Sequence, residues 1–154
     1  MIDPQHAISG EIAHAHHKVL WGEQKASLPL PRHLRYFLTG FVMEYLRFEG
    51  DVIGQAFGLV LTSGTCSSGK EFVRKLKRAG DGALLLAGLL PDDLPERREQ
   101  IRNISLAGQA QYAHAAALYL TYGVWWPGHL CSDIATLFFE LARVFRCSCG
   151  PPHE

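Results

Sequence analysis

Apolar residues recur at three- and four-residue steps along much of the chain, a spacing that places them on one face of a helix. The clearest stretch runs from residue 34 to residue 48, and its apolar positions are Leu34, Phe37, Leu38, Phe41, Tyr45 and Phe48. Gly50 follows this stretch, and glycine is the residue that most often ends a helix. The pattern predicts an amphipathic helix over residues 34–48.

Similar patterns predict helices over residues 10–24, 72–79, 83–90 and 96–122, and from residue 132 or 133 to 145. Residues 53–61 fit a shorter helix capped by Asp51, although their two glycines leave a buried strand as an alternative. Gly80-Asp81-Gly82 is expected to interrupt the chain between two helices, with Asp81 capping the second. Residues 123–128 are expected to form a turn that holds Trp125 and Trp126. Ser68 and Glu71 have capping-box spacing.

Composition supports a helical fold. Leu and Ala total 37 residues, against 19 for the β-branched types Val, Ile and Thr, which favour strands. The length of 154 residues fits one domain. The sequence therefore predicts a single all-α domain, 1–154, built as a bundle of about five or six helices, with frayed ends at about 1–9 and 148–154.

The charge of the chain and its processing signals indicate which partners and which cellular compartment to expect. Fifteen basic residues balance fifteen acidic ones, so no basic excess indicates a nucleic-acid partner. The basic stretch Lys70–Arg78 is interpreted as a solvated helix face. The start of the chain lacks a secretory pattern, and the four cysteines are too few and too unevenly spaced for a disulfide framework, so a cytoplasmic protein is expected. Residues 103–132 carry no charge, yet polar side chains and Pro127-Gly128 favour a buried helix over a membrane span.

One stretch resembles a known family. Gly80, Asp81, Leu84, Ala87, Gly88 and Pro91 have the spacing GD-x-x-L-x-x-A-G-x-x-P, and Gly108-x-x-x-Tyr112 follows. This pattern resembles the signature of a family of uncharacterised proteobacterial helical proteins. The resemblance implies a bacterial, cytosolic, helical protein and assigns no catalytic residue. Gly88 is expected to let another helix pack closely.

Histidines near the start are the candidate metal ligands. Glu11 and His14 are three positions apart, the spacing used by di-iron bundles, but such sites need the pattern twice and two further carboxylates. A smaller site for zinc or another transition metal would use Glu11, His14, His16 and His17. The competing interpretation, which we favour, is an exposed polar face that is rich in histidine.

Other candidate chemistry is less complete. Cys147 and Cys149, with His153, lack the two-residue spacing usual for zinc. The pairs Cys131 with His129 and Ser105 with His114 lack a third orienting group. Gly64 to Lys70 approaches a phosphate-binding loop, but Glu71 replaces the required Ser or Thr.

No catalytic set is complete, and the sequence therefore favours a module that is not an enzyme. Slim, alanine-rich and aromatic-rich helices favour a homodimer or a complex with another protein. Trp125 and Trp126 are expected to line such an interface, an apolar ligand pocket or the core. The alternative function is a small metal-binding protein or metal-dependent enzyme that uses the histidine cluster.

Overall fold

The computed structural model describes residues 4–61 and 69–149, and this part of the chain forms seven helices and no strand. They are α1 (Pro4–Ala26), α2 (Arg32–Arg47), α3 (Val52–Leu61), α4 (Gly69–Leu89), α5 (Pro95–Thr121), α6 (Trp125–Thr136) and α7 (Phe138–Cys149). The all-α prediction is confirmed. The described helices outnumber the five or six that were expected, and residues 53–61 form a helix and not a strand.

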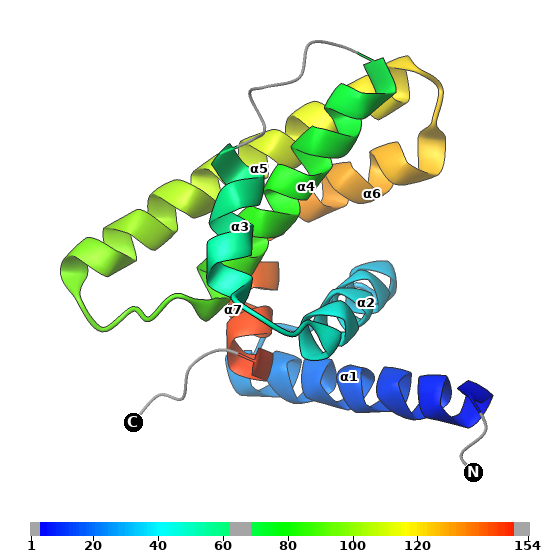
Figure 1. The fold of residues 1–154 in the computed structure, drawn as a ribbon. Helices are drawn as coiled ribbons and strands as arrows, with labels where there is room; N and C mark the ends of the chain where they lie inside the picture. Colours follow the sequence, from blue (N-terminus) through cyan, green and yellow to red (C-terminus); the bar gives the residue numbers. More distant parts are fainter. Residues whose placement is uncertain (1–3, 62–68, 150–154) are drawn as a thin grey trace.

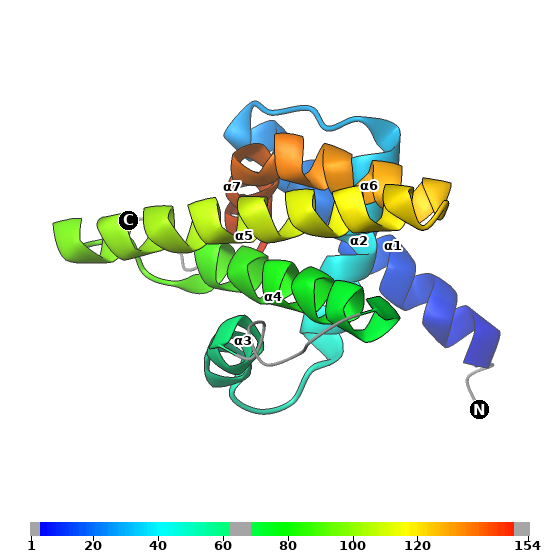
Figure 2. The same ribbon diagram turned by 90° about the horizontal axis from the view of Figure 1, so that it is seen from above.

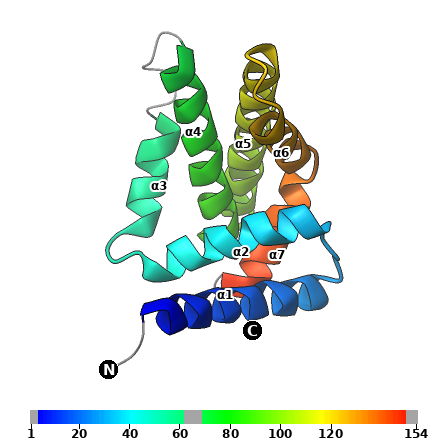
Figure 3. The ribbon, with the colours of Figure 1, turned by 90° about the vertical axis from the view of Figure 1, so that its right-hand side faces the viewer.

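The helices form two groups joined by α7 (Figure 1). Helices α3, α4, α5 and α6 stand side by side, and Figure 2 shows the long α5 running between α4 and α6. Helices α1 and α2 run across one end of this group in a separate layer (Figure 3). Helix α7 packs on both α1 and α4, so it ties the two layers together.

Gly80-Asp81-Gly82 does not interrupt the chain, and this prediction is wrong. Helix α4 continues through all three residues, and neither glycine has a positive φ. Both glycines are buried because neighbouring helices approach closely: a Cβ at Gly80 would lie 2.8 Å from the Tyr112 ring, and one at Gly82 would lie 2.8 Å from the Ala56 carbonyl oxygen. The glycines make room for α5 and α3 within one continuous helix.

The last helical segment also differs from the prediction. Trp125 and Trp126 belong to α6 and not to a turn, and Pro127 follows them in the first helical turn, where proline breaks no intrahelical hydrogen bond. The turn is shorter than expected and includes Gly123, whose φ of +76° favours glycine. Leu137 ends α6 with φ −107°, so residues 132–145 divide between two helices.

The core lies where α4, α5, α6 and α7 meet and continues into the layer of α1 and α2, and its largest fully buried side chains include Tyr112, Phe138 and Phe145. Residues 83–90 are enclosed by neighbouring helices, with most of them buried. Gly88 lies against the Phe145 ring, so the prediction that another helix packs closely there is confirmed.

Charged side chains form hydrogen bonds that hold the helix ends. Glu23, at 6% exposure, accepts hydrogen bonds from the Leu30 amide at 2.6 Å and from the Arg35 guanidinium at 2.7 and 2.9 Å, which closes the α1–α2 connection. The Arg146 guanidinium of α7 donates to the Ala87 and Leu90 carbonyl oxygens at 2.8 and 2.6 Å. These carbonyls lie at the end of α4, where a cation is favourable.

Two predicted caps have different outcomes. Asp51 accepts a hydrogen bond from the Gly54 amide at 2.9 Å and caps α3 as expected. Ser68 lies outside the described residues, as does the phosphate-loop segment up to that position.

Both ends of the chain were expected to fray, but α1 includes residues 4–9 and α7 includes residues 148–149.

Candidate functional site

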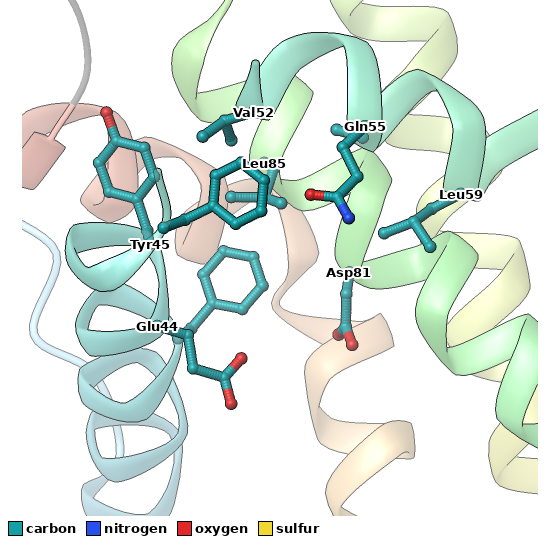
Figure 4. Close-up of a pocket in the computed structure, with 10 residues that line it drawn as sticks. Glu44, Tyr45, Val52, Gln55, Leu59, Asp81 and Leu85 are labelled. Carbon is teal, nitrogen blue, oxygen red and sulfur yellow. The ribbon is translucent and has the colours of Figure 1, made fainter. Parts of the chain in front are cut away.

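An apolar cavity of about 190 Å³ lies between α2, α3 and α4 (Figure 4). Its lining residues are Phe41, Glu44, Tyr45, Phe48, Val52, Gln55, Ala56, Leu59, Asp81 and Leu85. The carboxyl groups of Glu44 and Asp81 lie toward one end, the Gln55 amide points in their direction, and the Tyr45 hydroxyl points away from them. Concave apolar walls with a few convergent polar groups are typical of small-molecule sites.

A second cavity, of about 270 Å³, adjoins the first and shares Phe41, Glu44 and Asp81 with it. Lys77 and Tyr36 are among the residues that line only the second cavity. Glu44 and Asp81 therefore line both cavities. They come from α2 and α4, and the aromatic side chain of Phe41 is common to both spaces.

Asp81 is the centre of a hydrogen-bonded group on this wall. One carboxylate oxygen accepts a hydrogen bond from the Tyr112 hydroxyl, and the other accepts one from the Lys77 ammonium at 3.1 Å. Asp81 was expected to cap a helix, and that prediction is wrong because the residue lies in the middle of α4. Its carboxylate instead joins α4 to α5.

Burial and the Asp81 carboxylate change the pKa values of Tyr112 and Lys77. Burial, with Asp81 adding to it, raises the pKa of Tyr112 well above its usual value, so the phenol stays protonated and donates. Burial lowers the pKa of Lys77, but the attraction of Asp81 outweighs this and the net pKa is raised. Neither group is tuned toward neutral pH, where a general acid or base would work best.

The candidate nucleophiles are not assembled into a site. Cys131 is 1% exposed, and burial raises the pKa of its thiol to about 11, which leaves little reactive thiolate at neutral pH. His129 instead stacks on Trp125, with ring centroids 6.2 Å apart. The Ser105 hydroxyl donates to the Ile101 carbonyl oxygen, and the His114 ring packs on Phe72.

The predicted metal ligands lie on the outer part of α1. Glu11, His14 and His17 are exposed, His16 is half-buried, and the Glu11 carboxylate pairs with Arg47 of α2. Across residues 4–61 and 69–149, no group of three His, Cys, Asp or Glu residues is arranged to hold a metal ion. The histidine metal site stays a prediction.

The remaining sequence candidates are dispersed. Cys147 and Cys149 are free, half-buried thiols on α7, and His153 lies outside the described residues. Burial raises the pKa of Cys149. On the basic face, Lys70, Arg74 and Arg78 are exposed, as expected for a solvated face, whereas Lys77 turns toward Asp81.

Four large apolar side chains are exposed where α5 ends and α6 begins. We name this surface the aromatic corner: Tyr122, Val124, Trp125 and Trp126, with exposed fractions of 53, 39, 64 and 66%. Trp125 and Trp126 were singled out by the sequence, and their side chains do not fill the core. The surrounding segment from 103 to 132 carries no charge.

Glu44 and Gln55 were not identified as site residues from the sequence. They are exposed polar residues on two helices, a common position for such side chains, and nothing in the pattern relates them to Asp81. Asp81 does carry a signal, because an acidic residue beside a long apolar run needs a polar partner when it is buried. The sequence therefore predicts that Asp81 has a polar partner but does not identify which residue it is.

Comparison of the chain with protein-family models, with curated proteins and with solved structures gives no match. The resemblance to the proteobacterial signature therefore stays a prediction. None of the helices in the described part of the chain is both long and apolar enough to cross a membrane.

Proposed function

We propose that this protein is a non-enzymatic interaction module that forms a homodimer through the aromatic corner. The observation that carries the proposal is the exposure of four large apolar side chains within five consecutive residues. Such concentrations on a protein surface are typical of protein–protein interfaces, whose energetic centres are enriched in tryptophan and tyrosine.

Several features support this surface as an interface. The corner is formed by the α5–α6 turn and the first turn of α6, so its backbone is held by two helices that pack along one another. No charged residue within 103–132 has to lose its hydration when the corner is covered. A twofold dimer would place the same four side chains on both partners, which suits a self-complementary apolar patch.

The oligomeric state tests the proposal. Sedimentation velocity between about 1 and 100 μM covers the affinities expected of a transient dimer. We expect association in the wild type and at least tenfold weaker association in Trp125→Ala/Trp126→Ala. Trp21→Ala is the matched control, because Trp21 is 60% exposed on α1, away from the corner.

Two results would count against the homodimer. A wild-type protein that stays monomeric at about 100 μM would exclude self-association in the useful range. Equal weakening by Trp21→Ala would place the interface elsewhere.

Binding of a different protein at the aromatic corner is the second form of the same proposal. A bacterial cytoplasmic location is also part of the proposal, because free thiols such as Cys131 stay reduced there.

Metal binding by Glu11, His14, His16 and His17 is the alternative function. The exposure of His14 and His17 leaves their imidazoles accessible, whereas Glu11 would have to leave Arg47 to bind a metal ion. Isothermal titration of the untagged protein with Zn²⁺ tests it. Saturable binding that is lost in His14→Ala/His17→Ala would support the alternative, and the absence of binding would remove it.

A further inference from the structure

We propose that the cavity between α2, α3 and α4 binds a small organic monocation: an ammonium group attached to an aromatic ring or a short apolar chain. This inference does not depend on the aromatic corner, because none of the corner residues lines either cavity. It assigns a ligand class to the site around Glu44 and Asp81.

The charge of the site indicates a cation. Among the described residues, Glu44, Asp81 and Lys77 are the charged side chains that line the two cavities, and they sum to one negative charge. Lys77 neutralises Asp81 at 3.1 Å. The Glu44 carboxylate makes no hydrogen bond or ion pair with any other residue that the structure describes. A ligand with one positive charge would balance the site.

The position of the carboxylates indicates where the ammonium lies. Glu44 and Asp81 line both cavities, and Figure 4 shows their carboxylates toward the same end of the first. An ammonium group has three donors, and carboxylate oxygens and the Gln55 amide oxygen are suitable acceptors. Asp81 is held in place by Tyr112, so this acceptor is already oriented before a ligand arrives.

The rest of the lining indicates the apolar part of the ligand. Phe41, Phe48, Val52 and Leu85 provide apolar walls, and the two phenylalanine rings can also attract a cation through their faces. An apolar cavity of about 150 Å³ accommodates benzene, so about 190 Å³ accommodates one ring or a chain of similar size. An anionic ligand would be repelled by Glu44.

Binding of 2-phenylethylammonium to the full chain tests the proposal. Isothermal titration is expected to give one site per chain with a Kd below about 1 mM. Two probes with similar apolar groups serve as controls: 2-phenylethanol, which is neutral, is expected to bind at least about tenfold more weakly, and phenylacetate, which is anionic, is expected not to bind.

Three variants locate the site. Glu44→Gln removes the carboxylate charge and is expected to weaken binding by about three- to tenfold. Glu99→Gln, at an exposed glutamate on α5, is the matched control and is expected to leave the Kd unchanged. Val52→Phe places a ring at the cavity wall and is expected to abolish binding while circular dichroism shows an unchanged helix content.

The outcomes are decisive in either direction. The expected order of ligands together with a specific loss in Glu44→Gln supports the site. No saturable binding up to about 10 mM, equal affinity for the amine and the alcohol, or unchanged binding in folded Val52→Phe overturns it. Trp125→Ala/Trp126→Ala is expected to bind the amine like the wild type, which separates this proposal from the proposed homodimer.

Discussion

Glu23 shows how the neighbours of a single residue decide its role. Its carboxylate is nearly enclosed, yet three hydrogen bonds from Leu30 and Arg35 satisfy it. Burial acts to raise the pKa of Glu23, but the Arg35 and Leu30 hydrogen bonds outweigh burial and the net pKa is lowered. The residue therefore stabilises the α1–α2 connection in its charged form.

We predict a pH-dependent stability that depends on Glu23. The pKa of Glu23 is lower in the folded state than in the unfolded state, where it is about 4.3. The charged carboxylate therefore stabilises the fold at pH values above about 4.3, and this stabilisation is lost as the pH falls toward the folded-state pKa. Urea unfolding at pH 7 should show Glu23→Gln to be about 1–3 kcal/mol less stable than the wild type. The difference should shrink as the pH falls below about 4.3.

Glu99→Gln is the control for this experiment, because Glu99 is exposed on α5 and its loss should change the free energy of unfolding by less than about 0.5 kcal/mol. A difference between wild type and Glu23→Gln that stays constant from pH 7 to pH 3 would contradict the role assigned to the charge.

Asp81 marks the limit of prediction at the residue scale. The sequence places it between two glycines, and that local pattern is typical of a cap. The structure places it opposite Tyr112, which is 31 positions away. A local pattern reports backbone preferences, whereas the partner of a buried carboxylate depends on which helices pack together. For the same reason Glu44, Gln55 and Asp81 could not be grouped into one cavity from the sequence.

At the scale of helices, close packing explains the buried glycines of α4, which are Gly80, Gly82 and Gly88. A Cβ at Gly88 would overlap the Phe145 ring of α7, which is itself fully buried. We predict that Gly88→Ala lowers the free energy of unfolding by about 1–3 kcal/mol, because the core cannot accept the added carbon without moving that ring. Thermal and urea unfolding measure this loss.

Gly10→Ala is the matched control, because Gly10 also lies within a helix but a Cβ there meets nothing within 4 Å. This variant should gain up to about 1 kcal/mol from the higher helix propensity of alanine. If Gly88→Ala gains stability in the same way, the close contact between α4 and α7 is not a constraint on the fold.

The positions of most helices could be predicted because apolar periodicity reports which face of a segment is buried. The boundaries were harder. Gly80 and Gly82 looked like a break, but glycine inside a helix is tolerated where a neighbouring helix needs the space. Leu137 gave no signal of the break between α6 and α7, because an apolar residue in an apolar stretch is typical of a continuous helix.

At the scale of the whole molecule, α3 is the helix that contributes least to the core. Ala56 is its one buried residue, and its main contact is α4. The cavity that α3 lines together with α2 and α4 takes the place of direct packing between α3 and α2. Helix α4, in contrast, packs against α3, α5 and α7 and buries side chains along most of its length. Local stability follows the number of such buried contacts.

We therefore predict that α3 opens before the rest of the molecule. In hydrogen–deuterium exchange followed by mass spectrometry, amides of residues 55–61 should exchange at least about tenfold faster than those of residues 80–88 in α4, a difference of about 1.4 kcal/mol in opening free energy. Exchange of α3 and α4 as one cooperative unit would contradict this. Because α3 forms a wall of the cavity, saturating 2-phenylethylammonium should slow exchange in α3 more than in α4 if the cavity is its site.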